Sequence, residues 1–359
     1  MAISLVQHRR KYTQVQVAKF SDDKQPKMGL AAFFPSKTTK AKMVSIEVQR
    51  NKQKVAVDVM RCVDPVRNTF SRSTEKIFMP PFYNEMFDFT ACERYEETYG
   101  SGEIPNRSDL ARLSTDTNEN LLAIKNKILR AIEIQRSQVL QTGIVNLKNG
   151  DSIDYKRKAE SMKVLTGTDR WGQADANIYG DLEAGLQFIR SKGLSGATAV
   201  NAIFGSEALS RFMRDEKALK QADYRRINRI DIGMPQFNNT SGMVYHGQIG
   251  TGDYIVNIWS YNDTYEHPVT GVETPYIDPQ NVIMVSDDFK GLTSFGGIPA
   301  IMGNEDSGKY VGIQEGEFYV RDIIDQVKTT WDFIVASAPL VIPVSIDRIY
   351  TLNVGDADS

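Results

Sequence analysis

A single long amphipathic segment limits what this chain can fold into more than any other feature of its sequence. Between residues 116 and 143, apolar side chains recur at the three- and four-residue spacing of one helix face. The positions expected in the core are Leu121, Ile124, Ile128 and Ile132. The positions expected on the solvated side are Lys125, Lys127, Arg130, Glu133 and Arg136. At 1.5 Å per residue such a helix is roughly 40 Å long, so we expect it to serve as a spine on which the other elements pack.

The two ends of this segment carry capping signals. Asp116 is expected to cap the first turn, and Glu119, three residues later, completes a capping box. Gly143 supplies the left-handed residue that commonly follows the last turn of a helix. The sequence therefore predicts a helix with bounds at 116 and 143.

Composition and cysteine content are those of a protein made and kept in a cytoplasm. The chain has 359 residues, of which 41% are hydrophobic, and no apolar run approaches the roughly 20 residues of a membrane span. The first residues lack the apolar stretch of a signal peptide. Cys62 and Cys92 have no metal-ligand spacing, and two cysteines in this length do not form a disulfide framework, so both are expected to be free thiols.

The formal charge of -2 is unevenly distributed along the chain. Lys and Arg far outnumber Asp and Glu between residues 9 and 54, whereas the last residues, GDADS, are acidic. Residues 1–40 also lack sustained periodicity, so they are expected to form an extended N-terminal arm. The basic charge has two interpretations: a solvated arm, or an arm that contacts polyanions or an acidic neighbouring subunit.

Two hairpins and one projecting segment flank the spine in sequence. Alternating apolar residues predict a hairpin between 44–48 and 55–59, within a segment 41–61, and Asn149-Gly150 marks the turn of a second hairpin. The segment 62–89 between them is polar and Arg-rich, then aromatic and Pro-rich. Pro80-Pro81 excludes a central strand there, which favours a projection. Its aromatic residues would be an aggregation hazard unless another molecule covered them.

The second half of the chain predicts a mixed α/β unit followed by strands. Residues 169–300 contain a short helix at 181–191, a buried strand at 199–205 and a helix expected to be capped by Ser206. Residues 301–354 are expected to return as closing strands beside the spine. A terminal tail at 355–359 is expected to be disordered.

No catalytic, cofactor or metal site is predicted. Walker A and dinucleotide-binding patterns are missing. Ser195 lies in a sequence similar to a nucleophile elbow, but it follows a helix and precedes a strand, which reverses the required order. The isolated histidines His8, His246 and His267 are not expected to bind a metal or to be catalytic. The adjacent loop carboxylates Asp287-Asp288 and Glu305-Asp306 are expected to be solvated or to cap, with a weak cation site as the alternative. A soluble α/β hydrolase using Ser195 is kept as the alternative from another class.

Two short motifs carry a resemblance to a known family. Residues 334–340, IVASAPL, are similar to the apolar-Gln-Ser-Ala-Pro-Leu strand of the lambda-type major capsid proteins of tailed bacteriophages, with Ala336 where that family often has Gln. Residues 291–296, GLTSFG, are similar to its Gly-Leu-Arg-Thr-Tyr-Gly. The likeness runs in order from about Lys37 to Val354.

This resemblance implies an α+β protein with the Hong Kong 97 shell fold. The implied parts are an N-terminal arm 1–40, an extended loop 62–89, a peripheral domain containing 41–61, the spine within 90–168 and the closing strands 301–354, and an axial domain 169–300. The implied function is a major capsid protein of a tailed phage, not an enzyme. It would self-assemble in the host cytoplasm into hexamers and pentamers of an icosahedral virion shell that encloses double-stranded DNA.

The implied partners are other copies of the chain, a scaffolding protein, a portal and, as an option, a decoration protein, with no membrane. A bacterial nanocompartment shell of the same fold is the alternative within structural proteins. No catalytic residue is carried over, since the lambda-like branch is not expected to cross-link. The residues expected at contacts between subunits are Arg67, Arg72, Lys76, Phe78, Phe82 and Tyr83.

Overall fold

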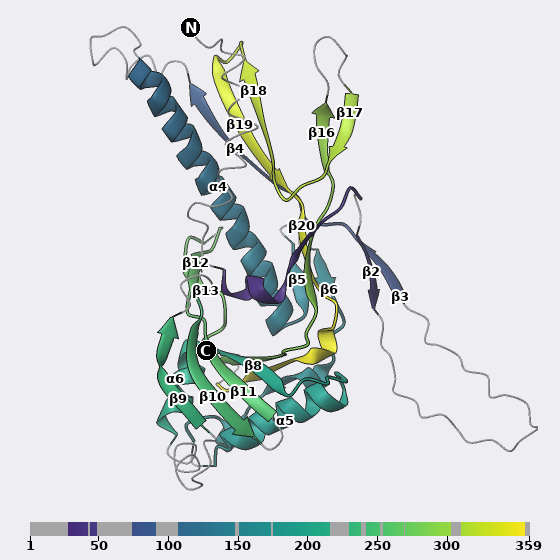
Figure 1. The fold of residues 1–359 in the computed structure, drawn as a ribbon, viewed down its shortest axis with the longest axis vertical. Coiled ribbons are helices and arrows are strands. Elements are labelled where there is room, and N and C mark those ends of the chain that lie inside the picture. Colours follow the sequence, from purple (N-terminus) through teal and green to yellow (C-terminus); the bar gives the residue numbers. More distant parts are fainter. Residues whose placement is uncertain are drawn as a thin grey trace, which may run out of the picture.

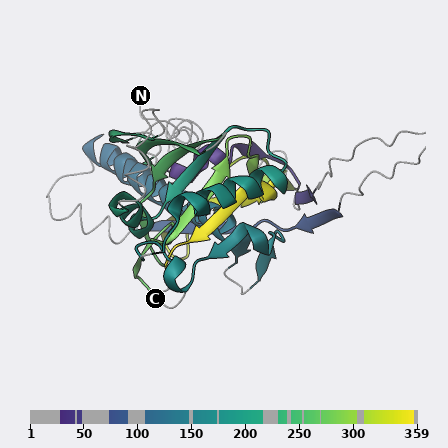
Figure 2. The ribbon, with the colours of Figure 1, turned by 90° about the horizontal axis from the view of Figure 1, so that it is seen from below.

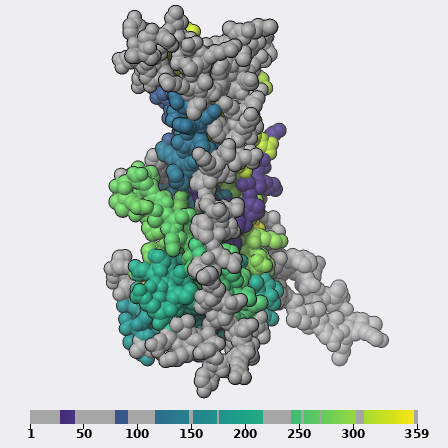
Figure 3. Space-filling view, turned by 60° about the vertical axis from the view of Figure 1, so that its left-hand side comes forward, coloured from purple at the N-terminus to yellow at the C-terminus, as the bar shows by residue number. Residues whose placement is uncertain are grey.

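A computed structural model describes residues 28–41, 44–48, 74–90, 107–147, 151–173, 175–215, 230–237, 242–251, 254–268, 270–302 and 310–355. A long helix, α4 (Arg107–Gln141), runs from a small sheet at one end of the molecule to an α/β unit at the other (Figure 1). In the space-filling view the teal and green residues of that unit gather below the blue residues of α4 (Figure 3).

The spine is longer than its sequence signals indicate. Helix α4 begins at Arg107, so the expected capping box of Asp116 and Glu119 is wrong, because both residues lie inside the helix. Residues 107–115, between the start of α4 and Asp116, contain neither Gly nor Pro and are therefore compatible with an N-terminal extension of the helix. The other end is confirmed: Gly143 has a φ of 73°, and its N–H donates to the carbonyl of Val139 at 3.0 Å.

The core positions of α4 are confirmed, whereas part of its expected polar face is wrong. Leu121, Ile128 and Ile132 are buried, and Ile124 packs against the same core while partly exposed. Glu133 and Arg136, expected in solvent, are also buried. The C-terminal half of the helix is covered from more than one side, so burial there extends beyond a single apolar stripe.

The lower unit is built on a seven-stranded sheet. Its order is β7 (Met162–Val164), β21 (Ile349–Asn353), β14 (Asn281–Ser286), β8 (Ala199–Phe204), β11 (Tyr254–Ser260), β10 (Val244–Thr251) and β9 (Ile230–Phe237). Helix α5 (Ile178–Ser191) lies across the sheet over β21 (Figure 2). Helix α6 (Ser206–Arg214) has Gly205 as its N-cap, so the expected cap at Ser206 is wrong by one residue.

Two strands of this sheet, β7 and β21, come from segments that the sequence analysis assigned to the peripheral domain with the spine. β21 pairs antiparallel with β14 and parallel with β7, so it lies inside the sheet of the lower unit, where it also contacts the end of α4. Buried side chains from segments between Leu165 and Val354 therefore share one core, including Leu182, Phe204, Ile258 and Leu352.

The sheet at the other end of the molecule has the order β18 (Tyr319–Asp325), β19 (Thr330–Ser337) and β4 (Tyr83–Thr90). One face packs on α4 through aromatic rings: Phe87 stacks on Phe333 at 5.1 Å, and Phe89 meets Phe333 edge-on. Side chains along β4 alternate between this face and solvent. The closing strands β18 and β19 thus lie beside the spine, as the sequence predicts.

Residues 28–38, which we call the strap, are held by their own subunit. The strap comprises a 3-10 turn, η2 (Gly29–Phe33), and β1 (Ser36–Thr38). β1 pairs parallel with β15 (Gly291–Phe295), which pairs with β20 (Pro339–Pro343). Leu30 and Phe34 are buried, so the expected extended arm is wrong for this part of 1–40, because these two side chains supply a local apolar face. Residues 1–27 lie outside the described residues.

Of the two predicted hairpins, the second is confirmed. β5 (Ile144–Asn146) pairs with β6 (Ser152–Asp154), as Asn149-Gly150 predicts. For the first, β2 (Val44–Val48) pairs with β3 (Thr74–Phe78), and the expected partner strand 55–59 lies outside the described residues. Two further ribbons are β12 (Thr264–Glu266) with β13 (Glu273–Pro275), and β16 (Ile298–Met302) with β17 (Tyr310–Gln314).

Candidate assembly surface

The β16–β17 ribbon exposes a face made of apolar residues alone. Pro299 pairs with Ile313 and Ile301 with Val311, so these four side chains share one face of the ribbon, which we call the ribbon face. Three of them are 66% (Ile301), 81% (Val311) and 51% (Ile313) exposed. On the opposite face Ile298 is buried with residues of the β19–β20 junction. The ribbon face therefore has no cover within the described subunit.

A second exposed apolar group lies on and before β4. Phe82, one of the expected contact residues, is 50% exposed, and Met79 and Met86 are 57% and 58% exposed. Neither methionine was among the contact residues expected from the sequence. The exposure of Met86 could have been predicted from the alternation of the strand, because Met86 lies on the same side as exposed Asn84 and Asp88.

The remaining expected contact residues divide into three cases. Tyr83 faces inward: its hydroxyl accepts a hydrogen bond from Gln135 on α4 at 3.0 Å, and burial raises the pKa of its phenol. Lys76 and Phe78 belong to β3, but their side chains lie outside the described part of the structure. Arg67 and Arg72 are outside the described residues entirely.

A buried carboxylate holds the strap against the spine. Glu133 Oε1 accepts from the N–H of Leu30 at 2.7 Å and from the hydroxyl of Tyr261 at 3.2 Å, and Oε2 accepts from Arg136 Nη1 at 3.0 Å. Arg136 also donates to the hydroxyl of Thr293 on β15 at 3.2 Å. Burial raises the pKa of Glu133, and the Arg136 guanidinium opposes that shift. These contacts join the strap, α4 and β15 through two side chains, Glu133 and Arg136, which the sequence pattern had both assigned to solvent.

A second buried cation closes the other end of the spine. Arg157 donates to the carbonyls of Leu140 at 2.7 Å and Gln141 at 3.1 Å, which are among the last of α4, and to the hydroxyl of Thr351 on β21 at 2.9 Å. Burial lowers its pKa to about 9 against the opposing effect of Asp347. The guanidinium thereby satisfies carbonyls that a helix end leaves unpaired, and it ties the spine to the seven-stranded sheet.

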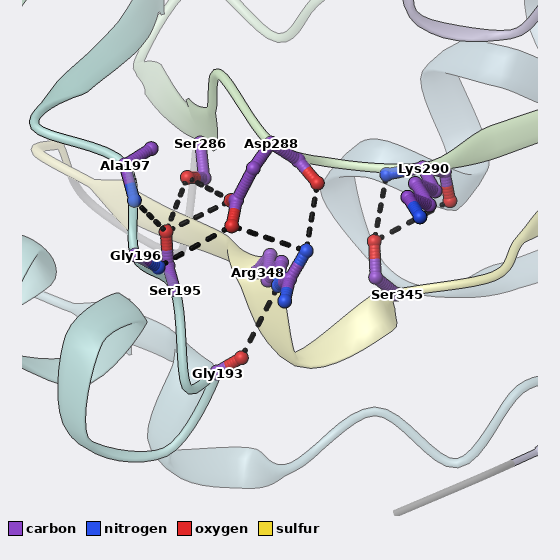
Figure 4. Close-up of polar contacts among 9 residues, drawn as sticks. All are labelled: Gly193, Ser195, Gly196, Ala197, Ser286, Asp288, Lys290, Ser345 and Arg348. Carbon is purple, nitrogen blue, oxygen red and sulfur yellow. Dashed lines mark hydrogen bonds and ion pairs between the residues drawn. The ribbon is translucent and has the colours of Figure 1, made fainter.

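Ser195 belongs to a polar network that joins loops (Figure 4). Its hydroxyl donates to Asp288 Oδ1 at 2.8 Å and lies 2.8 Å from the hydroxyl of Ser286. Arg348 pairs with Asp288 Oδ2 at 3.2 Å and donates to the carbonyl of Gly193 at 3.3 Å. Burial raises the pKa of Asp288, but hydrogen bonds from Ser286 and Ser195 and the charge of Arg348 outweigh it, so the pKa is lowered.

This network lacks the arrangement of a serine hydrolase. A carboxylate with a lowered pKa is a weak base, and activation of a serine needs a base that itself is oriented by a third group. His246 bonds to Ser260 at 2.8 Å instead. Within the part of the chain that the structure describes, no three His, Cys, Asp or Glu side chains gather as a metal-binding group. None of the helices in the described ranges combines the length and hydrophobicity that a membrane crossing requires.

The structure thus combines a spine helix, a strand-rich lower unit and an apolar ribbon face that the described subunit leaves uncovered. The model of one protein family, described as phage major capsid protein E, matches residues 17–354. This chain belongs to that family. A comparison with curated proteins found no match to the chain.

One solved structure has the fold of this phage major capsid protein E, and two more show a weaker likeness. A protein assigned as a prophage capsid protein in Escherichia coli CFT073 is 16% identical, with a TM-score of 0.62 over 96% of this chain and 99% of that chain. A phage-related protein from Bordetella bronchiseptica RB50 is 13% identical, with a TM-score of 0.49 over 95% and 96%. An encapsulin complex from Synechococcus elongatus is 11% identical, with a TM-score of 0.44 over 96% of both chains. The first of these likenesses shows the Hong Kong 97 type of fold.

Proposed function

We propose that this chain is the major capsid protein of a tailed bacteriophage and assembles into hexamers and pentamers of an icosahedral shell around double-stranded DNA. The observation that carries the proposal is the family match across residues 17–354, which includes the spine, both sheets and the strap. The family favours a phage shell over a bacterial nanocompartment of the same fold.

The uncovered apolar residues support assembly from copies of this chain. Burying one Ile or Val side chain of the ribbon face yields about 1.5 to 3 kcal/mol. The ribbon face and the group around Phe82 are different surfaces, so a contact between them would join unlike patches of two subunits. Such contacts close into rings when the rotation between subunits permits it, which is the geometry of pentamers and hexamers.

The further partners follow from this role. A scaffolding protein and a portal would take part in assembly in the host cytoplasm, a decoration protein is optional, and the enclosed DNA would be held without sequence recognition. Ser195 and Asp288 then have a structural task, to hold three connections of the lower unit together. The proposal is that the chain is not an enzyme.

Sedimentation velocity and negative-stain microscopy of the purified chain test the proposal. We expect megadalton shells from the wild type. The double variant Ile301→Ser and Val311→Ser should stay folded by circular dichroism but form few shells, because it removes apolar surface only where a neighbour would cover it. Val272→Ser is the matched control, since Val272 is 60% exposed but lies outside the ribbon.

The contrary outcomes are distinct. Intact shells from the double variant would show that the ribbon face is not an assembly contact. A small discrete oligomer with esterase turnover that disappears in Ser195→Ala would favour the hydrolase. If the chain forms shells but its gene has no terminase and portal genes beside it, the nanocompartment would be favoured.

A further inference from the structure

The three-stranded sheet formed by β18, β19 and β4 has an open edge at β18. In the described part of the chain, β18 pairs with β19 on one side and with no strand on the other. It lies at the far end of α4 from the lower unit (Figure 1). An unpaired edge presents a row of backbone N–H and C=O groups to which the strand of another molecule can add.

The side chains at this edge do not protect it from pairing. Ile323 and Ile324 are 43% and 41% exposed, and Val327, in the turn that follows β18, is 94% exposed. The register between β18 and β19 has no shift, so no β-bulge bends the edge away, and β18 contains no Pro. The edge therefore combines available hydrogen-bonding groups with exposed apolar side chains.

The charges of β18 lie on one face of the sheet with Ile323. Asp322 is opposite Phe333, so it faces α4, and Arg321, Ile323 and Asp325 alternate with it on the other face. Arg321 has no ion-pair partner among the described residues. Asp325 Oδ1 accepts from the N–H groups of the two turn residues 327 and 328, at 2.9 and 3.1 Å, which leaves its second oxygen for another partner.

These positions make the edge complementary to itself in one register. When two copies of β18 pair antiparallel about a two-fold axis, opposite side chains share a face, so the axis must pass through a residue. With the axis at Ile323, Arg321 lies opposite Asp325 of the other copy, and this ion pair occurs twice. An axis at Asp322 or at Arg321 sets two like charges against each other. An axis at Ile324 places Asp325 opposite an isoleucine.

We propose that β18 is a contact between two copies of this chain, in which the two strands pair antiparallel about Ile323 and merge their sheets into one. The inference rests on the proposed function, since the partner is a second capsid subunit. A two-fold contact joins two copies only, so it links subunits of adjacent rings, whereas contacts between unlike patches close the rings themselves. The ladder between residues 321 and 325 is short, so the contact is weak alone and forms when rings present many copies together.

Charge exchange between separate chains tests the register. Arg321→Glu alone and Asp325→Lys alone each set like charges against one another, so each should lower the yield of shells about tenfold and leave free rings in sedimentation velocity. An equimolar mixture of the two variants should restore the yield, because each contact between unlike chains then has opposite charges at both pairs. A folding defect in the turn would not be restored by mixing. Lys328→Glu, a charge reversal outside the ladder, is the control and should leave the yield unchanged.

Disulfide formation locates the axis. In a chain whose Cys62 and Cys92 are replaced by Ser, Ile323→Cys should give cross-linked dimers in assembled shells. Opposite Cα atoms of an antiparallel pair are about 4.5 to 5.5 Å apart, which a disulfide can span. Val327→Cys is the control, because this position is more exposed but lies opposite Tyr319 in the proposed register, roughly 26 Å along the strand from its own copy.

The contrary outcomes separate this contact from the proposed function. Wild-type shells without restoration in the mixture, or with equal cross-linking of Ile323→Cys and Val327→Cys, overturn the strand contact and leave the proposed function standing. Rings that fall apart in Arg321→Glu would place β18 inside a ring and overturn the contact between rings. A wild type that forms no shells overturns the proposed function and this contact with it.

Discussion

Replacing Glu133 with Ala should detach the strap from the spine. The substitution removes the acceptor of the buried Leu30 N–H, of the Tyr261 hydroxyl and of Arg136. The side chain of Arg136 is only 7% exposed, so it would remain as a buried charge without its carboxylate. Breaking a buried ion pair on one side costs about 3 to 5 kcal/mol, and an orphaned buried N–H costs about 1 to 3. Because the two losses share one site, we expect about 4 kcal/mol in total.

Equilibrium unfolding in urea measures this loss, and hydrogen exchange locates it. A loss of about 4 kcal/mol is a large part of an ordinary stability of about 5 to 15 kcal/mol. Exchange should rise first in residues 28–38, since the strap loses its anchor. Glu133→Gln keeps one acceptor oxygen and should cost about half as much. Glu119→Ala, on an exposed position of the same helix, is the control and should stay within about 0.5 kcal/mol of wild type.

A Glu133→Ala variant whose free energy of unfolding falls by less than about 1 kcal/mol, with unchanged amide exchange in the strap, would contradict this role of Glu133. Such a result would mean that Leu30 and Phe34 alone hold the strap by burial. A second check is the pair Glu133→Ala with Arg136→Ala, which removes both charges. It should be less destabilised than the sum of the single variants, because no unpaired charge then remains.

Three further substitutions test other parts of the fold. Ile128→Asp should abolish soluble protein, because an unpaired buried carboxylate costs several kcal/mol. Normal expression of this variant would show that Ile128 does not lie on the buried face of the helix. Gly143→Ala should lower the free energy of unfolding by about 1 to 2 kcal/mol, since φ is positive there, and an unchanged urea midpoint would count against the helix end described. Asp288 has a folded pKa below its unfolded value, so its stabilisation is present above about pH 4 and lost as pH falls through the lowered pKa. Asp288→Asn should remove that part of the acid sensitivity, which pH-dependent unfolding of both proteins would reveal.

Local sequence patterns correctly predicted those features that depend on interactions between residues close together in the sequence. The buried positions of the spine follow from helical period, Gly143 from the need for a left-handed residue, and the 144–154 hairpin from Asn-Gly. The exposure of Phe82 follows from Pro80-Pro81, which keeps that segment out of the centre of a sheet.

Features that depend on distant segments were not predictable in this way. Glu133 has a polar side chain on a helix, and it becomes a buried acceptor only because Leu30 and Tyr261, which are distant in sequence, pack against it. Sequence periodicity contains no information about such tertiary contacts. The same applies to β21, whose apolar residues suit any buried strand and whose neighbours β7 and β14 are fixed by tertiary packing.

The internal place of β21 sets an order of events during protein synthesis. The strand occupies Ile349–Asn353, yet it lies between β7 and β14, which leave the ribosome earlier. Until residues 349–353 have been made, a nascent chain therefore lacks the strand that lies between β7 and β14, and the facing edges of these two strands are unpaired. Strand pairing over such sequence separations is slow. Nascent subunits are thus exposed to mispairing during this interval, and the lower unit is finished only when β21 has been added.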